Sequence, residues 1–321
     1  MKPPVFYFGG KRKIAPELWK RFGKPNVYIE PFVGMAATLL ARPVDSFPKT
    51  FRETVNDRDA LVANFFRSAK LAPEQVLDSA SDPPMEIELR ARWTHINKHR
   101  GGLRHRLLDL EFCDPQTAGW FLYCYANFIR PAAASAEPKA LKPSTRASGV
   151  LSPNARDGAW GYFAALKERL ANVRICCGDY MGTLTDAEVK VSGRQSVCAL
   201  IDPPYRKNAK MYADGADAFD YDALIKRCIE LGEMENVRVA LCGYSDDYSL
   251  PDDWRIEEWA ETQGGVEAIW FSPGCRNPKV SHFWENNCAP VDVVEEYANA
   301  SPTLDTLAGL FSIIRRDEET M

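Results

Sequence analysis

Short apolar runs alternate with amphipathic stretches along most of this chain. The apolar runs are bounded by turn residues, as in buried strands, and the stretches between them repeat apolar residues at helical spacing. Such alternation is typical of βαβ units and predicts a mostly parallel sheet covered by helices. We expect strands at Val27–Phe32, Thr50–Asn56, Val173–Cys177, Val197–Ile201, Val237–Cys242, Trp254–Trp259 and Ala268–Ser272. We expect helices between them at Ala15–Phe22, Ala36–Arg42, Asp59–Lys70, Gly158–Ala171 and Tyr221–Glu233.

The middle of the chain departs from this alternation, because no strand pattern is convincing between Lys70 and Gly158. A stretch rich in Ala, Ser and Pro, Ala132–Pro153, is typical of a long loop. The other segments predict helices at Met85–Arg100, Leu103–Phe112 and Pro115–Ile129. A helical insert therefore divides the α/β core.

Four parts of the chain follow from these patterns. Residues 1–70 and 158–288 are expected to form the α/β core, residues 71–157 the helical insert, and residues 289–321 a tail. The tail contains LDTLAGLFSIIRR, whose apolar residues recur at helical spacing and predict an amphipathic helix.

Composition excludes several classes of protein. Of the 321 residues 45% are apolar, which is ample for a buried core. No apolar run approaches the roughly 18 residues of a membrane-spanning helix, and the first residues lack the apolar stretch of a signal peptide. The nine cysteines form neither a CxxC pair nor a Cys/His cluster at metal spacing. We therefore expect a cytoplasmic protein without a disulfide framework or a metal site.

Basic residues concentrate in the insert, although the net charge of the whole chain is −4. The stretch Arg90–Arg106 contains six Lys and Arg residues and no acid, and Arg130–Arg156 contains five against one Glu. A solvated helix face could carry the same charges. If the protein binds a polyanion, these two stretches are where we expect the contact.

Two places near the N-terminus combine a strand end with polar residues. The strand in VYIEPFVGMA runs into Glu30 and then into a turn at Gly34, and the next strand ends in Asn56 and Asp57. Ligands of open α/β sheets bind at the carboxyl ends of strands, and an acid after the second strand can accept ribose hydroxyls. The alternatives are that Gly34 makes a purely structural turn and that Asn56 or Asp57 caps the following helix.

The strongest chemical signal is CALIDPPY, residues 198–205. An apolar strand delivers Asp202 at its carboxyl end, and Pro203 and Pro204 remove two backbone donors. The remaining groups are acceptors, the Asp202 carboxylate and the Pro203 carbonyl, beside the ring of Tyr205. Acceptors without donors next to a flat ring suit a planar NH2 group on a heterocycle, which Tyr205 would hold by stacking. A proline-rich structural turn is the alternative.

These motifs together resemble the DNA adenine methylase (Dam-like) family, in particular its bacteriophage and prophage variants. The resemblance rests on YFGGKRKIAPEL, EPFVGMAATLL and DPPY, in that order, and extends from about Tyr7 to Pro273. It implies a doubly wound, Rossmann-like methyltransferase sheet with a helical target-recognition insert. It also implies S-adenosylmethionine as cofactor, double-stranded DNA as partner and methyl transfer to the exocyclic amine of adenine. This chemistry needs no metal, and we expect a monomer in the cytoplasm of a bacterial or phage-infected cell.

The resemblance assigns roles to individual residues. The residues implied to bind S-adenosylmethionine are Tyr7, Gly9, Gly10, Lys11, Glu30, Phe32, Gly34, Asp57, Asp179 and Asp202. Those implied to be catalytic are Asp202, Pro203, Pro204 and Tyr205. The basic residues expected to contact DNA are Arg90, Arg92, Lys98, Arg100, Arg104, Arg106 and Arg130. One departure concerns cofactor affinity, because Ala36 stands where the family usually has a second glycine.

Other interpretations remain open at this point. The same acceptors could serve a methyltransferase acting on RNA or on a protein amide, and Ala36 is compatible with a catalytically silent DNA-binding protein. A cytosine methyltransferase that uses Cys275 is disfavoured, because the Pro-Cys pair typical of that chemistry is absent. Trp120, Tyr123 and Tyr125 are expected to form the core of the insert.

Overall fold

The computed structural model describes residues 1–276, apart from positions 8, 44, 46, 84, 128–155, 191–194, 208–218 and 263. The chain divides into two compact units, Met1–Cys288 and Ala289–Met321, and the described residues all belong to the first. The expected loop Ala132–Pro153, the tail helix and Arg130 lie outside the described residues.

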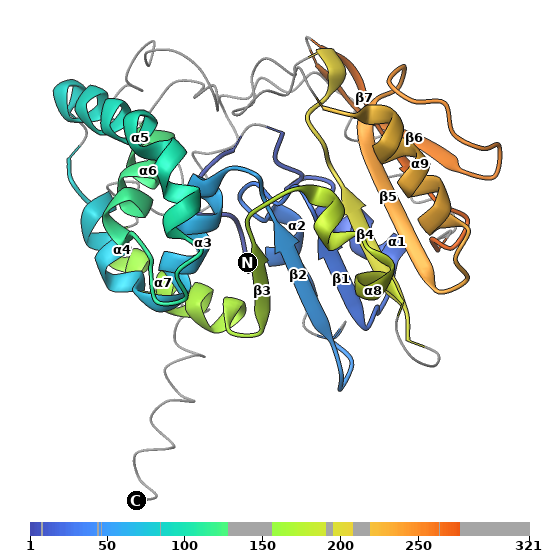
Figure 1. The fold of residues 1–321 in the computed structure, drawn as a ribbon, viewed down its shortest axis with the longest axis horizontal. Coiled ribbons are helices and arrows are strands. Elements are labelled where there is room, and N and C mark those ends of the chain that lie inside the picture. The colour runs from blue at the N-terminus through green and yellow to red at the C-terminus, as the bar shows by residue number, and fades with distance from the viewer. Residues whose placement is uncertain are drawn as a thin grey trace, which may run out of the picture. The chain divides into compact units, whose positions relative to one another are not determined.

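One sheet organises the described part of the chain (Figure 1). Its seven strands lie in the order β3-β2-β1-β4-β5-β7-β6. Strands β1 to β5 run parallel, and β7 runs antiparallel to both β5 and β6. The strands are β1 (Val27–Glu30), β2 (Arg52–Asn56), β3 (Val173–Cys176), β4 (Val197–Ile201), β5 (Val237–Tyr244), β6 (Arg255–Thr262) and β7 (Gly265–Phe271). The predicted α/β class with a mostly parallel sheet is therefore confirmed.

The strand order reverses between β1 and β4, the two central strands. From β1 the chain first builds outward through β2 to β3, and it then returns to place β4 on the other side of β1. Connections leave these two strands toward opposite faces of the sheet, and open α/β sheets have their binding crevice beyond the carboxyl ends of the strands at such a point. The residues that follow Glu30 and those that follow Ile201 lie at this point of the sheet.

Alternating side chains of the strands enter two separate hydrophobic layers. Tyr28 and Leu200 belong to the layer that also contains Leu18 and Phe22 of α1 (Ala15–Phe22) and Leu39 of α2 (Ala37–Leu40). On the opposite face the layer is formed by β-strand residues together with α8 (Asp186–Val189) and α9 (Tyr221–Gly232), and it includes Ile29, Ile201, Val189, Leu224 and Leu231. The central strands β1 and β4 are thus buried on both faces, as parallel strands require.

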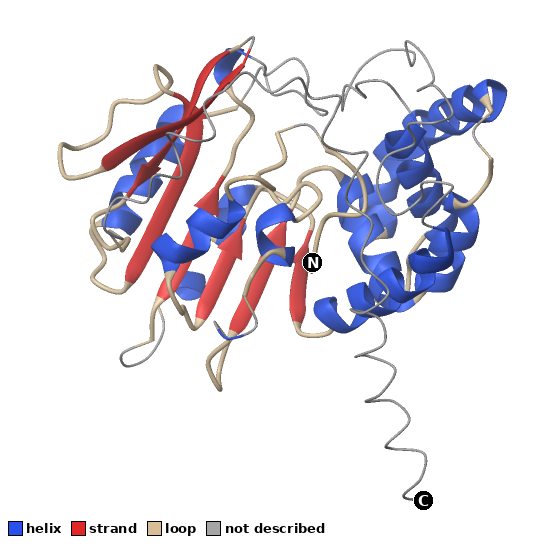
Figure 2. Cartoon of the chain, turned by 180° about the vertical axis from the view of Figure 1, so that it is seen from behind, coloured by secondary structure: helices blue, strands red, loops and turns tan. Residues whose placement is uncertain are grey.

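Helices α3 to α7 gather beyond the β3 edge of the sheet (Figure 2). Close packing between α4 and α6 depends on Gly119 of α6, because a Cβ there would lie 2.5 Å from the carbonyl oxygen of Val76 in α4. Tyr123 and Tyr125 are fully buried in this helical group and Trp120 is half-buried, largely as expected. The helices are α3 (Ala60–Leu71), α4 (Pro73–Ala80), α5 (Glu86–Arg106), α6 (Pro115–Asn127) and α7 (Arg156–Leu170).

Two predictions for the insert are wrong. The sequence pattern does not predict helix α4, and the two helices expected at Met85–Arg100 and Leu103–Phe112 are one helix, α5, followed by a turn. Gly101 and Gly102 lie inside α5, where each costs about 1 kcal/mol relative to alanine. The helix continues because Leu103 is buried in the helical core and because Arg100 is anchored outside the helix.

No disulfide bond joins cysteines of the described residues. None of the helices in this part of the chain combines the length and the apolar character needed to cross a bilayer.

Candidate functional site

The N-terminal segment before α1 folds into a tight turn. The amide of Gly10 donates to the carbonyl of Tyr7 at 3.0 Å, and Gly9 has a φ of 75°. The Lys11 ammonium donates to the Gly9 carbonyl at 2.7 Å. This turn directs Tyr7 and Lys11 to two different places at the carboxyl edge of the sheet.

Lys11 forms a buried ion pair with Asp202, the residue that follows β4. Its Nζ lies 2.7 Å from Oδ2 of Asp202, and the side chains are 3% and 16% exposed. Burial opposes the charge of Lys11, but the carboxylate of Asp202 raises the pKa of the lysine well above its ordinary value. Burial also raises the pKa of Asp202, and Lys11 opposes that shift. The geometry favours the charged pair, which keeps Asp202 as an acceptor.

Tyr205 lies against this ion pair. Its ring centroid is 5.2 Å from Nζ of Lys11 and 5.0 Å from the ring of Tyr244, which meets it edge to face at 74°. Tyr205 is only 5% exposed, so it is a packed residue at this edge of the sheet. Glu267 of β7 is also close enough to interact electrostatically with Lys11 and Asp202, and burial raises its pKa.

The two prolines after Asp202 differ in what their carbonyl groups do. The carbonyl of Pro204 accepts the hydroxyl of Tyr221 at 2.7 Å. The carbonyl of Pro203 accepts no hydrogen bond from the described residues. Within the described part of the chain, the backbone acceptor that the sequence motif predicts therefore has no donor.

Glu30 ends β1 as a buried carboxyl. It accepts a hydrogen bond of 2.9 Å from the hydroxyl of Tyr28. Burial raises its pKa to about 8, the Tyr28 bond opposes this shift, and the nearby charge of Asp202 adds to it. A positive charge brought next to such a carboxyl lowers its pKa and favours the ionised form.

The turn after β1 contains two residues in the left-handed region. Gly34 has a φ of 47°, and a Cβ there would lie 3.0 Å from the ring of Tyr7. Ala36 has a φ of 56° and is the single non-glycine residue with positive φ among those described. The position where the Dam-like family usually has glycine is therefore one that glycine would occupy without strain.

Asp57, the residue after β2, holds this turn by hydrogen bonds to backbone amides. Its Oδ2 accepts the amide of Gly34 at 3.0 Å and its Oδ1 accepts the amide of Asp59 at 2.9 Å. Burial raises the pKa of Asp57 to about 7, the charge of Asp59 adds to the shift, and the two amides oppose it. Each carboxylate oxygen keeps a further lone pair for an external donor.

The alternative that Asn56 or Asp57 caps the next helix is wrong. Helix α3 begins at Ala60, and its N-cap is Asp59, whose Oδ1 accepts the amide of Leu61 at 3.0 Å. The side-chain amide of Asn56 instead donates to the carbonyl oxygens that follow β1 and β3, at 3.0 and 3.1 Å. Asp57 is left free of a capping role.

Phe32 and Asp179 lie at the same edge of the sheet but away from the ion pair. Phe32 packs against Tyr180 and Phe219, with ring centroids 5.2 and 5.8 Å apart. Asp179 follows β3, is exposed, and accepts the amide of Met181 at 2.9 Å. The structure does not bring these two into direct contact with Lys11 or Asp57.

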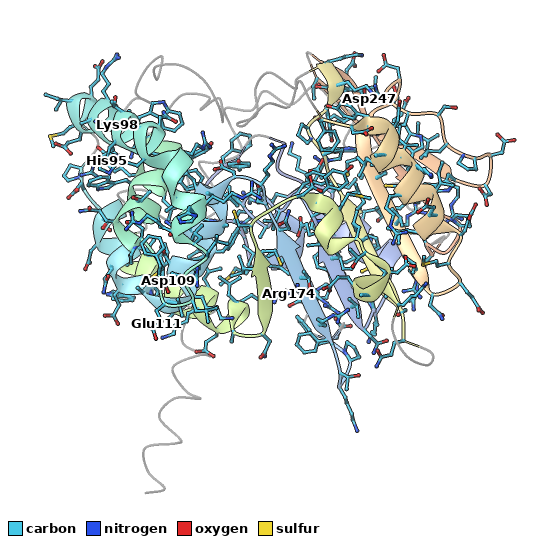
Figure 3. All side chains as sticks on the ribbon, viewed as in Figure 1. His95, Lys98, Asp109, Glu111, Arg174 and Asp247 are labelled. Atoms are coloured by element: carbon cyan, nitrogen blue, oxygen red, sulfur yellow. The ribbon has the colours of Figure 1, made fainter. Side chains whose placement is uncertain are left out.

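The basic residues of α5 fall into two groups. Several are paired with acids: Arg90 with Glu86, Arg92 with Asp82 and Glu88, Arg100 with Asp59, and Arg106 with Asp114 at 3.8 Å. Lys98 and Arg104 are exposed and form no ion pair with described residues. Figure 3 shows Lys98 and His95 on the helical insert, apart from the sheet.

Four residues of the site are not assigned to it by the sequence motifs. Asp59, Tyr244 and Glu267 contact or face residues of the motifs, and the ring of Tyr125 stacks on Tyr7 at 5.2 Å with an interplanar angle of 26°. Glu267 has a local signal, because it is an acid within the apolar strand GVEAIWF. Asp59, Tyr244 and Tyr125 can be assigned to the site only once it is known which distant segments of the chain are in contact.

Comparison of the sequence with models of known protein families and with curated proteins gave no match. Among the described residues no group of three or more His, Cys, Asp or Glu side chains could hold a metal ion.

Proposed function

We propose that this protein transfers a methyl group from S-adenosylmethionine to the exocyclic amine of adenine in double-stranded DNA. The observation that carries the proposal is the acceptor pair after β4. The Asp202 carboxylate lies close to Lys11 and Tyr205, and the Pro203 carbonyl accepts no hydrogen bond from the described residues. Both residues follow β4, at the carboxyl edge where the strand order reverses. Doubly wound, Rossmann-like sheets bind their ligands at this place.

The residues after β1 and β2 fit S-adenosylmethionine. The absence of a Cβ at Gly34 lets the ring of Tyr7 lie against the turn, because a Cβ there would be 3.0 Å from that ring. Asp57 keeps lone pairs for the ribose hydroxyls, and Glu30 can offer a carboxylate to the ammonium group of the methionine part. When bound, S-adenosylmethionine supplies a methyl group on a positively charged sulfur.

The acceptors after β4 would act on the amine. Asp202 and the Pro203 carbonyl would each accept one N–H, which orients the nitrogen lone pair and increases its electron density. The adenine must leave the duplex to reach them, because the amine is otherwise inside the base stack. Fixing both reactants in line contributes up to about 7–11 kcal/mol to lowering the barrier.

Lys11 has a defined part in this proposal. It occupies one oxygen of Asp202 before a base arrives and keeps that carboxylate ionised and fixed. An incoming amine takes an acceptor site beside it, and Glu267 provides a second carboxylate that favours the lysine charge. Lys11 is therefore a positioning residue and Asp202 a catalytic residue.

The experiment is a direct assay of methyl transfer. The full chain is incubated with isotopically labelled S-adenosylmethionine and, separately, with duplex DNA, RNA and protein. We expect label in adenine of DNA, loss of more than about 100-fold in Asp202→Ala, and parental activity in the exposed control Asp252→Asn. Label only in RNA or protein would contradict the choice of DNA, and DNA binding without cofactor binding would indicate a silent DNA-binding protein.

A further inference from the structure

Arg100 lies where the helical insert meets the sheet, although the sequence suggests a DNA contact. Its Nε donates to Oδ1 of Asp59 at 3.2 Å, and its second guanidinium nitrogen bonds Oδ2 of the same carboxylate. The two side chains are 11% and 8% exposed. A forked, largely buried pair of this kind fixes both partners in position.

Hydrogen bonds connect Asp59, which Arg100 holds in position, to the candidate cofactor site. One of its oxygens caps α3 through the amide of Leu61, and its own amide donates to Asp57. Asp57 in turn holds the amide of Gly34. A continuous chain of hydrogen bonds therefore runs from α5 to the turn after β1.

We propose that Arg100 is a positioning residue of the cofactor site, which holds Asp59 and through it the ribose acceptor Asp57. The inference rests on the proposed function, because it concerns the same cofactor. In this proposal Arg100 increases the affinity for S-adenosylmethionine and does not contact a DNA phosphate. The helical insert thereby acts on the cofactor site as well as on any nucleic acid.

The charges around Asp57 give this role a measurable signature. The groups that face it are Asp59, Arg100 and Tyr7 of the N-terminal segment, and Tyr125 of α6 lies next to Tyr7, Asp59 and Arg100. Burial and Asp59 raise the pKa of Asp57, and Arg100 lowers it. Without Arg100 two neighbouring carboxylates face each other in a buried place, so ionised Asp57 forms only at higher pH.

The test measures the affinity for S-adenosylmethionine by calorimetry between about pH 6 and pH 9. In Arg100→Ala we expect about a tenfold loss near neutral pH and a shift of the affinity profile upward by about one pH unit. Arg100→Lys keeps the charge but not the fork, and its shift should be smaller. Asp59→Asn retains the helix cap but removes a negative charge beside Asp57. In this variant the pH profile of the affinity for S-adenosylmethionine should therefore shift to lower pH.

Arg92→Ala is the matched control, because Arg92 is another buried, ion-paired arginine of α5 whose partners lie within the insert. It should lower the thermal stability and leave the affinity profile unchanged. Parental affinity and profile in both Arg100→Lys and Asp59→Asn would overturn the inference. Equal losses in Arg92→Ala and Arg100→Ala would also overturn it. A parent protein that fails to bind S-adenosylmethionine would instead overturn the proposed function.

Discussion

Nζ of Lys11 lies 2.7 Å from Oδ2 of Asp202, so the first turn of the chain is joined to the end of β4 by a buried pair of charges. Truncating one partner of such a pair leaves the other charge buried without compensation. Both residues belong to motifs of the sequence, but their contact is a property of the fold.

Replacement of Lys11 by methionine should therefore destabilise the protein by about 3–5 kcal/mol at neutral pH. The loss should become smaller as the pH falls, because Asp202 can then become neutral by taking up a proton. Urea denaturation at several pH values measures it. Lys226→Met, which changes an exposed lysine of α9, is the control and should have little effect. A loss in Lys11→Met that does not depend on pH would show that the charge of Asp202 is not its cause.

Replacement of Tyr205 by leucine should separate binding of the base from binding of the cofactor. Leucine keeps an apolar side chain against Tyr244 but removes the ring on which a base would stack. We expect single-turnover methylation to fall by about 100-fold, with cofactor affinity changed little. Tyr205→Phe should retain most of the activity. Methylation by the leucine variant at the parental rate would remove Tyr205 from the reaction.

The buried carboxyl of Glu30 should make stability depend on pH. Its pKa is about 8 in the folded protein, against an ordinary value of 4.5, so the folded state binds the proton more tightly. Its contribution to the free energy of unfolding is complete below about pH 4.5 and is lost as the pH rises through about 8.

Glu30→Gln should therefore flatten this dependence and raise stability near pH 8, by on the order of 3 kcal/mol. Part of the pH dependence of the free energy of unfolding should remain, because the pKa of Asp57 is also raised, to about 7. The exposed control Glu235→Gln should leave the profile as it is. A parental slope in Glu30→Gln would show that Glu30 ionises normally.

Ala36 and its neighbour Ala37 should respond differently to glycine. Ala36 has a φ of 56°, so relief of the left-handed strain offsets the entropy that glycine loses on folding. We expect Ala36→Gly to change stability by less than about 0.5 kcal/mol, and Ala37→Gly, at the start of α2, to cost about 1 kcal/mol. Thermal denaturation of both variants makes the comparison, and equal losses would contradict it.

The exposed basic residues of α5 should determine the salt dependence of DNA binding. Lys98→Ala together with Arg104→Ala should reduce the slope of log affinity against log salt by about 0.9 for each DNA phosphate that is no longer neutralised. Arg92→Ala, whose guanidinium is buried and paired, should leave the slope unchanged. A parental slope in the Lys98→Ala/Arg104→Ala variant, with a reduced slope in Arg92→Ala, would show that the exposed face of α5 is merely solvated.

Local patterns locate the seven strands of the sheet, although they do not predict the short helix α8. The bounds of β4, Val197–Ile201, and of α1, Ala15–Phe22, agree with the prediction, because each is a short apolar or amphipathic run closed by turn residues. The predicted division of α5 is wrong, since Gly101 and Gly102 usually end a helix and the burial that holds this one together is tertiary.

The candidate site shows the same division between local and long-range information. The motifs locate Lys11, Asp57 and Asp202, because each lies beside a strand end or a glycine turn. They cannot show that Arg100 pairs with Asp59 whereas Lys98 stays exposed, because a buried arginine and a phosphate-binding one look alike in a basic stretch. That distinction depends on which acid the fold brings to the helix.

The strand order has a consequence for the growing polypeptide. Strand β1 pairs with β2 on one side and with β4 on the other, and the whole helical insert is synthesised between β2 and β4. The β4-facing edge of β1 therefore stays open on the ribosome until residues 197–201 emerge, and Lys11 has no Asp202 to pair with before then. At about 5–20 residues per second this delay lasts on the order of ten seconds or more. The helices of the insert, whose contacts are more local, have time to assemble during this interval, so the crevice is completed late in synthesis.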